Sequence, residues 1–509
     1  MLLQKPAFLL FYHARAAEAS FGEWLGVLWH GLSLDCTVAG YVTAFPVLVV
    51  LASFWIPLSQ RVWRIVLTVY FSLIALVTAA IFAVDLNLYG YWGFRLDGSV
   101  LIYLSDPGEA LASASWGEVL RQILIMLVYA GAMIWSYRWI LRLFRVEPVP
   151  LRGRVVPTVA ALLIGGLTFL AIRGGVTVAT ANVSKVYFSS NMFLNHAATN
   201  PVFSFLSSVG DNENYAEAYP FFEEERRKTL FEELRGNRPG ADAGTPRLLR
   251  SDRPNVVLIL LESFGRTIMD ETVNGEPVMP NMQRFKREGV WFENFFANSF
   301  RTDRGQVAVL CGFPAQTTMS IMKLPRKSAT LPSLARSLGR EGYRSVFMYG
   351  GDLNFTNQAS FMYSTGWEEL IWQKDMQLDA PTSKWGYADD VVIDAFTDHV
   401  LAEAASQRPF FAAMLTLSSH EPFDVPFAKF DDPMLNAMAF TDASLGRFVE
   451  RVRQTPVWND LLVILIADHA YPYPYGIANS DALRHRIPML WLGGAVRRPA
   501  VVETYGSQS

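Results

Sequence analysis

The sequence is poor in cysteine and in charge. Cysteine occurs only twice in 509 residues, as Cys36 and Cys311, so the cysteines do not support a disulfide framework. Charged residues make up 18% of the chain, the net charge is −3, and no basic run or tail suggests a nucleic-acid partner. With 51% hydrophobic residues, the chain is too apolar for an ordinary soluble protein. The apolar excess lies in the first 180 residues, and the remainder has the composition of a globular protein.

Four apolar stretches are each long enough to cross a bilayer, which takes about 20 residues of helix. They are Thr37 to Trp55, Ile65 to Val84, Val119 to Leu141 and Val155 to Ile172. None has a charge at its centre or a polar face, which argues against helices buried in a soluble core. We therefore predict a transmembrane domain over residues 1–180. Met1 to Tyr12 is apolar but too short to span, and we interpret it as part of a fifth helix.

Arginine is distributed unevenly between the expected loops. Two arginines lie between the first two stretches, five lie at or between the ends of the last two, and the loop from Asp85 to Glu118 is mostly acidic. The positive-inside rule places the arginine-rich loops in the cytoplasm. These arginines are Arg61, Arg64, Arg138, Arg142, Arg145, Arg152 and Arg154. The sequence thus predicts a multi-pass protein of the cell (inner) membrane, with everything after Arg173 on the extracytoplasmic side.

Residues 181–250 are expected to connect the membrane domain to a second domain. Ala216 to Arg235 is charged and amphipathic, which predicts a solvated helix. Gly236 to Thr245 has the composition of a flexible linker. Residues 251–509 then form an extracytoplasmic domain.

In this second domain, short apolar runs alternate with helical patterns, which predicts an α/β fold with a mostly parallel central sheet. Gly289 and Gly342 stand where helix C-caps belong. The expected strands are Val256 to Leu261, Ser345 to Tyr349, Phe410 to Leu417, Leu461 to Ala467 and Pro488 to Leu492. The expected helices are Asn281 to Glu288, Leu331 to Glu341 and Phe440 to Arg453.

Polar side chains follow three of these strands directly. Glu262 follows the first, His420 follows Ser418 and Ser419 after the third, and Asp468 and His469 follow the fourth. Ligands of such sheets bind at the carboxyl ends of the strands. Carboxylate and imidazole donors that meet there predict a divalent cation site.

A site of this kind needs a nucleophile, and the segment 298–312 offers Ser299, Thr302 and Cys311. Thr302 is flanked by Arg301, Asp303 and Arg304. A metal-bound hydroxyl loses its proton more easily, and guanidinium groups can bind phosphoryl oxygens. The alternative interpretation is a charged surface turn.

Four motifs together resemble a known family. They are Asn-Val-Val-Leu-Ile-Leu-Leu-Glu-Ser-Phe at 255–264, Ser-Phe-Arg-Thr-Asp-Arg-Gly at 299–305, Ser-Ser-His-Glu-Pro-Phe at 418–423 and Ala-Asp-His at 467–469. The chain resembles the lipoteichoic acid synthase-like, sulfatase-fold membrane transferases of the alkaline phosphatase superfamily. That family carries about five membrane helices before an extracytoplasmic catalytic domain.

The resemblance implies site residues and a cofactor. Glu262, Thr302, Asp468 and His469 match the family's metal ligands, and Thr302 matches its transiently phosphorylated nucleophile. His420 matches a substrate-binding histidine, and Trp385-Gly386 with Asp389 resembles a segment near the site. Arg301 and Arg304 are expected to contact the phosphoryl group. The metal implied is Mn²⁺, with Mg²⁺ or Zn²⁺ as alternatives.

The sequence also departs from the family's pattern. Ala470 follows Asp-His where the family often has glycine, and Tyr349, Thr356 and Gln358 replace a cationic and aromatic head-group pocket. Asp352 adds a carboxylate that could pair with an ammonium group. The pattern therefore predicts a substrate pair other than that of the glycerol-phosphate polymerases, with phosphoethanolamine as plausible as phosphoglycerol. The chain also stops soon after the last expected strand, which suggests a truncated sequence.

The implied reaction moves a phospholipid-derived head group to a lipid, glycan or glycolipid acceptor through phosphothreonine. A phosphodiesterase would share every catalytic residue and stays an alternative. A sulfatase is disfavoured, because Cys311-Gly-Phe-Pro-Ala-Gln lacks the spacing and the arginine of the sulfatase motif. A non-catalytic scaffold is disfavoured because all four expected metal ligands are present, and a transporter because the membrane stretches lack central ionisable residues.

Overall fold

The computed structural model describes residues 1–98, 100–101, 115–145, 150–209, 220–235, 247–316, 319–406 and 408–509. The chain divides into two compact units, Met1–Ala218 and Tyr219–Ser509. The predicted linker Gly236 to Thr245 lies outside the described residues.

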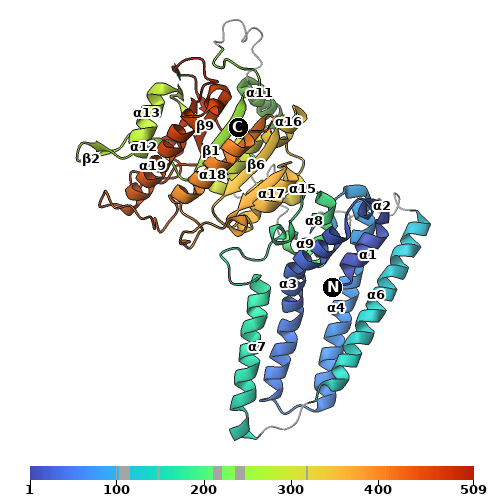
Figure 1. The fold of residues 1–509 in the computed structure, drawn as a ribbon. Coiled ribbons are helices and arrows are strands. Elements are labelled where there is room, and N and C mark those ends of the chain that lie inside the picture. Colours follow the sequence, from blue (N-terminus) through green and yellow to red (C-terminus); the bar gives the residue numbers. More distant parts are fainter. Residues whose placement is uncertain are drawn as a thin grey trace. The chain divides into compact units, whose positions relative to one another are not determined.

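In the N-terminal unit, four helices of the described chain are long and apolar enough to cross a membrane (Figure 1). They are α3 (Phe21–Ser53), α4 (Gln60–Trp92), α6 (Trp116–Leu143) and α7 (Val155–Arg173). Helix α4 packs against α6, and α3 packs against α7. The predicted stretches Ile65 to Val84 and Val119 to Leu141 form the central parts of α4 and α6, Thr37 to Trp55 overlaps the C-terminal part of α3, and Val155 to Ile172 covers nearly all of α7.

The helices extend beyond the predicted stretches because polar residues cap them. Ser20 and Ser115 each form a capping box with the glutamate three residues later, at the starts of α3 and α6. Helix α3 therefore includes Asp35, and α4, which continues to a left-handed C-cap at Gly93, includes Asp85; the expected stretches leave both aspartates out. The membrane helices therefore do carry ionisable groups, contrary to the prediction.

Short helices pack against these long ones. They are α1 (Gln4–Phe11), α2 (His13–Ala16), α8 (Met192–Ala198) and α9 (Pro201–Ser208). Helix α1 has eight residues, too few to cross a bilayer. Its Lys5 is buried and forms a 2.6 Å ion pair with Asp35. The apolar N-terminal segment is thus a short packed helix in this structure.

The C-terminal unit contains an eight-stranded sheet with the order β11-β4-β10-β9-β1-β8-β6-β7. Strand β10 runs antiparallel to both of its neighbours, and the other pairs are parallel. The strands are β1 (Asn255–Leu261), β4 (Val290–Phe292), β6 (Arg344–Tyr349), β7 (Glu369–Trp372), β8 (Phe410–Leu415), β9 (Leu461–Ala467), β10 (Met489–Leu492) and β11 (Ala500–Val502). The prediction of an α/β domain with a mostly parallel sheet is confirmed.

The principal helices of this unit are α13 (Pro280–Glu288), α14 (Thr302–Cys311), α16 (Leu334–Arg340), α17 (Gln358–Ser364), α18 (Asp389–Glu403) and α19 (Pro433–Arg453). A further charged helix, α11 (Glu224–Arg235), precedes the sheet, within the range where an amphipathic helix was predicted. Gly289 follows α13 in an extended conformation, not a left-handed one. A β-carbon at Gly289 would lie 2.3 Å from the carbonyl oxygen of Trp491, so glycine is required there by close packing against β10.

Candidate active site

The central strands bring two carboxylates to one edge of the sheet. Strands β1 and β9 are parallel neighbours, and Leu261 pairs with Ala467 in register. The next residue of each strand, Glu262 and Asp468, therefore emerges beside the other at the carboxyl edge. Ser263 adopts a φ of 63°, in the left-handed region, so the chain turns sharply directly after β1.

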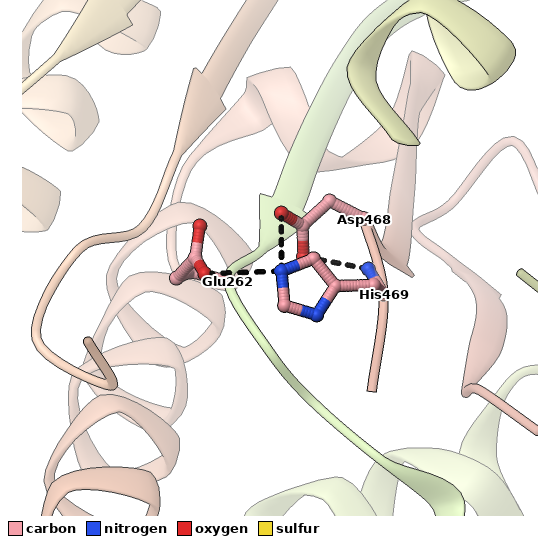
Figure 2. Close-up of side chains that lie close together, drawn as sticks. All are labelled: Glu262, Asp468 and His469. Carbon is pink, nitrogen blue, oxygen red and sulfur yellow. Dashed lines mark hydrogen bonds and ion pairs between the residues drawn. The ribbon is translucent and has the colours of Figure 1, made fainter. Parts of the chain in front are cut away.

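Glu262, Asp468 and His469 are buried and face one another (Figure 2). Each offers one ligand atom, and these atoms lie within 4.8 Å of one another. The His469 Nε2 atom lies 3.5 Å from Glu262 Oε1 and 3.6 Å from Asp468 Oδ2. The other ring nitrogen, Nδ1, lies 3.0 Å from the Ala470 carbonyl oxygen, so it is the protonated nitrogen when the ring is neutral and Nε2 is left to bind a ligand.

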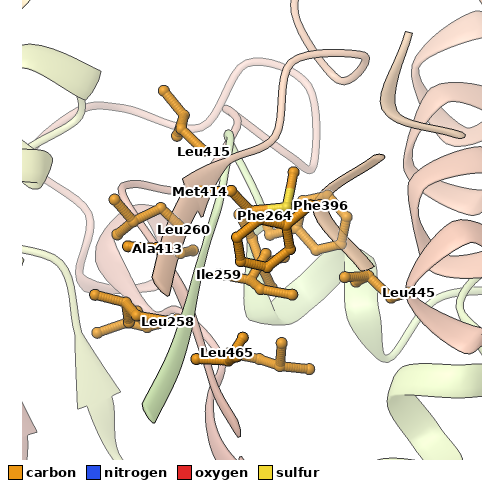
Figure 3. Packing of buried hydrophobic residues seen from close by; sticks show 14 of the residues in the cluster. Leu258, Ile259, Leu260, Phe264, Phe396, Ala413, Met414, Leu415, Leu445 and Leu465 are labelled. Carbon is orange, nitrogen blue, oxygen red and sulfur yellow. The ribbon is translucent and has the colours of Figure 1, made fainter. Parts of the chain in front are cut away.

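The base of this site is the hydrophobic core (Figure 3). Leu258, Ile259 and Leu260 of β1 are at most 2% exposed and pack among buried residues of the neighbouring strands and helices. The pairing of β1 with β8 on one side and β9 on the other fixes the position at which Glu262 leaves the sheet. The metal-ligating candidates thus stand on rigid elements, as a preorganised site requires.

Thr302 is the first residue of helix α14, and its hydroxyl lies beside Glu262 and His469. Its Oγ1 atom is 3.1 Å from Glu262 Oε2 and 3.3 Å from His469 Nε2. The helix N-terminus adds a partial positive charge at this point. Gly305 lets α14 approach β9, because a β-carbon there would lie 2.1 Å from the carbonyl oxygen of Asp468. In the Thr-Asp-Arg-Gly sequence, the glycine is therefore required for close packing, and the other residues supply functional groups.

The charges of this cluster are not balanced. Burial raises the pKa of Asp468, and the nearby Glu262 carboxylate raises it further. Burial would also raise the pKa of Glu262, but the hydrogen bond and charge of His469 lower it overall. For His469, burial acts to lower the pKa, and the charge of Asp468 and the contact with Glu262 raise it to about 9.

The donor set fits a divalent cation. Two buried carboxylates share one imidazole, and Asp468 Oδ2 has no hydrogen-bond partner among the described residues. Asp468 Oδ1 is already held by the backbone N–H groups of Ser263 and His469, at 2.9 and 2.7 Å. The orphaned oxygen, the second carboxylate and the free imidazole nitrogen form the mixed oxygen and nitrogen set that such ions prefer.

A cleft of about 400 Å³ opens above Thr302. His420 lines it, its ring centroid 4.0 Å from that of Trp385, and its Nδ1 lies 3.1 Å from the Glu421 carbonyl oxygen. Arg301 also lines the cleft, with its Nε 3.4 Å from Asp303 Oδ1. Arg304 is buried and lines a small neighbouring cavity instead. Of the two arginines expected to bind substrate, the structure places one in the cleft.

The two aspartates expected to contact substrate do not line this cleft. Asp352 Oδ1 accepts hydrogen bonds from the backbone N–H and the side-chain amide of Asn354, both at 2.9 Å, so it closes a turn. Asp389 is 1% exposed, and its carboxylate accepts bonds from Leu417 N–H, Ser418 N–H and the Thr441 hydroxyl. The Asp389 carboxylate therefore supports the segment that leads to His420.

Tyr349, Thr356 and Gln358 all line the cleft, as expected of a head-group pocket. Gln358 accepts a 3.0 Å hydrogen bond from the buried Gln306 of α14. The sequence did not identify six further lining residues: Ser263, Phe300, Phe355, Glu421, Tyr471 and Pro472. The repeated Tyr-Pro pattern directly after Asp-His was the available signal for the last two.

Comparison with known proteins agrees with this architecture. The family model described as Sulfatase matches residues 254–509, half of the chain. A phosphoglycerol transferase I of Xanthomonas campestris pv. campestris is 30% identical over 279 residues, which are 50% of this chain and 39% of the relative. Lipoteichoic acid synthase 1 of Bacillus subtilis is 26% identical over 246 residues, 42% of this chain and 36% of the relative. The chain therefore spans about two fifths of the length of the curated relatives it matches.

Two solved structures share the fold. One is an alkaline phosphatase superfamily protein of Vibrio parahaemolyticus, with a TM-score of 0.50 and 24% identity over 57% of this chain and 73% of the other. The second is the lipoteichoic acid synthase LtaP from Listeria monocytogenes, with a TM-score of 0.50 and 19% identity over 55% and 74% of the two chains. With the family match over half of its length, the chain belongs to the sulfatase family, and its C-terminal unit has the fold of the alkaline phosphatase superfamily.

Proposed function

We propose that this protein is a metal-dependent transferase that moves a phosphoglycerol head group from a membrane phospholipid to an acceptor outside the cytoplasm. The observation that carries the proposal is the position of Thr302. Its hydroxyl lies 3.1 Å from Glu262 and 3.3 Å from His469, at the N-terminus of a helix and at the floor of an open cleft. A hydroxyl beside a carboxylate and an imidazole is the arrangement of an activated nucleophile.

The reaction would have two displacements at phosphorus. In the first, Thr302 Oγ forms a bond to the donor phosphorus and the bond to the diacylglycerol oxygen breaks. The Thr302 proton leaves through the adjoining carboxylate or imidazole, and diacylglycerol departs as an alcohol after taking up a proton. In the second, an acceptor hydroxyl forms the new bond to phosphorus, the bond to Thr302 Oγ breaks, and the threonine hydroxyl regains a proton.

Glu262, Asp468, His469 and the Thr302 hydroxyl would hold one divalent cation, with Mn²⁺ proposed and Mg²⁺ or Zn²⁺ as alternatives. When bound, such an ion lowers the pKa of a coordinated hydroxyl and offsets charge on the phosphoryl group. His420 and Arg301, which line the cleft, would hold the substrate. Arg301 is about half exposed, so it can turn toward a phosphoryl oxygen.

Phosphoglycerol is the head group that the observations favour. Several relatives are phosphoglycerol transferases by name, the first at 30% identity. The argument for phosphoethanolamine depended on Asp352, whose carboxylate closes a turn and does not line the cleft. The remaining pocket residues, Tyr349, Thr356 and Gln358, are uncharged hydrogen-bonding groups that suit the hydroxyls of glycerol.

The apolar helices make this a membrane protein. We propose that all four cross the cell (inner) membrane and that the catalytic unit lies on the extracytoplasmic side, because the arginines cluster in the loops that would face the cytoplasm. This orientation would give the catalytic unit access to phospholipid head groups of the outer surface.

The test offers the full-length protein, reconstituted in lipid nanodiscs with Mn²⁺, either phosphatidylglycerol or phosphatidylethanolamine. Diacylglycerol release from phosphatidylglycerol alone, absent in Thr302→Ala, is the expected result. Release from phosphatidylethanolamine alone would overturn the head-group assignment. Release of free glycerol phosphate even when acceptors are in excess would identify a phosphodiesterase instead of a transferase.

A further inference from the structure

We propose that the N-terminal unit carries a binding site for an anionic phospholipid, in a groove along the first turns of helix α4. The groove has a volume of about 470 Å³. Its lining residues are Gln60, Arg61, Arg64, Ile65, Thr68 and Val69. All of them belong to the N-terminal unit, whereas the cleft beside Thr302 is lined by residues of the C-terminal unit. The lipid groove is thus a separate site and does not depend on the proposed reaction.

The lining residues follow the spacing of a helix. They come in pairs four positions apart, so they form one stripe on the surface of α4. Arg61 and Arg64 form the polar end of this stripe, and Ile65 and Val69, 52% and 54% exposed, form its apolar part. The stripe is about 12 Å long at 1.5 Å per residue. A phospholipid has the same order of groups, with a charged phosphate next to apolar chains.

The polar end of the groove has guanidinium groups to spare. Helix α4 packs against α6 (Figure 1), and Arg64 Nη2 and Gln60 Nε2 donate to the Phe144 carbonyl oxygen at the end of α6, at 3.0 and 2.6 Å. These bonds hold the half-buried Arg64 in place. Arg61 is exposed, and in the described part of the chain it forms neither a hydrogen bond nor an ion pair. The fork of a guanidinium group matches two oxygens of a phosphate, so Arg61 and Arg64 together suit a phosphodiester.

The surrounding charge selects an anionic head group. The segments 54–64 and 135–158, which hold this end of α3, α4, α6 and α7, contain seven arginines and a single acidic residue. The ammonium group of phosphatidylethanolamine would be repelled there, whereas phosphatidylglycerol has no positive group. With the orientation proposed above, the lipid would belong to the cytoplasmic leaflet, where the catalytic unit does not act.

Thr68 supplies a second, independent observation. Other hydroxyls of the membrane helices donate to the carbonyl oxygen four residues earlier, as Ser136 and Thr168 do at 2.8 Å. Among the residues that the structure describes, the Thr68 hydroxyl forms no such bond, although it lines the groove. It lies one helical turn, about 6 Å, below Arg64. The ester carbonyl groups of a phospholipid lie just below its phosphate, so one of them can accept this hydrogen bond, which favours a whole lipid over a free anion.

The test measures which lipids the full-length protein retains. The protein is kept free of metal with a chelator, released from nanodiscs of equal phosphatidylglycerol and phosphatidylethanolamine, and analysed by native mass spectrometry. We expect retained phosphatidylglycerol in preference to phosphatidylethanolamine. Arg61→Gln should lower this retention by about tenfold, the loss expected for a charge-assisted contact, and Thr68→Val by about threefold. Arg61 has no partner among the described residues, so its replacement should leave the unfolding temperature in phosphatidylethanolamine alone unchanged.

Two matched variants serve as controls. Arg152→Gln removes another exposed arginine that does not line the groove, and should lower retention less than about twofold. His420→Ala alters the catalytic cleft and should leave the Arg61-dependent lipid bound, which separates it from a donor lipid held beside Thr302.

Retention of phosphatidylglycerol that depends on Arg61 but not on Arg152 or His420 supports the lipid groove. Equal retention of the two lipids, an equal loss in Arg61→Gln and Arg152→Gln, or loss of the lipid in His420→Ala would overturn it. Glycerol phosphate offered in solution should not displace the lipid, because it lacks the chains that contact Ile65 and Val69; displacement would show an anion site and would also overturn the proposal.

Discussion

The two units of this protein bury charges in opposite ways. In the N-terminal unit, each buried aspartate has its own cation: Lys5 lies 2.6 Å from Asp35, and Arg95 lies 3.1 Å from Asp85. Asn200 adds a 2.7 Å hydrogen bond to Asp35. In the C-terminal unit, two buried carboxylates, Glu262 and Asp468, share the single imidazole of His469.

This difference separates structural charges from functional ones. Buried charges that each have an opposite charge within ion-pair distance hold helices together, because their net charge is balanced in a medium that excludes water. A cluster with excess negative charge is stable only if something else completes it, and a divalent cation supplies that charge. The comparison predicts that changes in the first cluster alter stability and that changes in the second alter chemistry and metal binding.

The largest expected effect is on catalysis by the second cluster. Thr302→Ala removes the hydroxyl at the N-terminus of α14 that we propose as the nucleophile, and should reduce head-group transfer by about a thousandfold or more. Thr302→Ser keeps a hydroxyl and should retain measurable transfer. Rates of diacylglycerol release from phosphatidylglycerol check both variants, and the thermal unfolding temperature controls for folding. Transfer by the alanine variant within tenfold of the unmodified protein would remove Thr302 from the mechanism.

Breaking a pair in the first cluster should affect stability instead. Lys5→Met leaves Asp35 buried with only Asn200, and we expect a loss of about 3–5 kcal/mol in the free energy of unfolding. The double variant Lys5→Met/Asp35→Leu should recover most of this loss, since no unpaired charge is left. Thermal unfolding in nanodiscs measures both variants. If the single and double variants were equally unstable, the ion pair would not be the cause.

Metal binding should distinguish the clusters directly. Mn²⁺ at a hundredfold excess over its dissociation constant should stabilise the unmodified protein by about 2.7 kcal/mol, and a chelator should reverse this. Glu262→Ala should abolish the stabilisation, whereas Lys5→Met/Asp35→Leu should keep it. Metal content by elemental analysis provides a second readout. Full metal content in Glu262→Ala would place the ion elsewhere.

The smallest effect concerns a buried carboxylate outside both clusters. Burial raises the pKa of Asp389 from its ordinary value of 3.8 to about 6, so the folded state holds this proton more tightly than the unfolded chain. The resulting stability is present below about pH 4 and is lost as the pH rises through 6. In Asp389→Asn, the change in the free energy of unfolding over this pH range should be smaller by about 1–3 kcal/mol. A residual slope should persist, because burial also raises the pKa of Asp442 to about 6. Chemical unfolding between pH 4.5 and 7 measures how the free energy of unfolding depends on pH. An unchanged slope in Asp389→Asn would contradict the raised pKa of Asp389.

The parts of the fold that could be predicted are those set by local patterns. Apolar runs followed by Glu262 and by Asp468 predicted two strand ends, and the in-register pairing of β1 and β9 brings these ends together. Asp352 and Asp389 do not line the cleft, and their partners, Asn354 and Thr441, follow from turn and helix geometry that no periodicity reveals. Helices α3 and α6 begin before the predicted apolar stretches, because Ser20 and Ser115 cap them.

Sequence patterns also could not predict the short strands or the contacts between residues distant in the sequence. Strands β4, β7 and β11 have three or four residues each, too few to show a period. The pairing of Lys5 with Asp35 joins residues 30 apart and depends on how α1 packs. Such contacts are set by the assembled core and not by the local sequence.

Covalent capture of the head group on Thr302 tests the account most directly. The full-length protein would be incubated in nanodiscs with phosphatidylglycerol and Mn²⁺ but no acceptor, quenched in acid, digested and analysed by mass spectrometry. The account predicts a phosphoglycerol adduct on the peptide that contains Thr302, formed together with diacylglycerol and lost when an acceptor is added. Diacylglycerol release with no adduct on Thr302, and with undiminished release in Thr302→Ala, would contradict it.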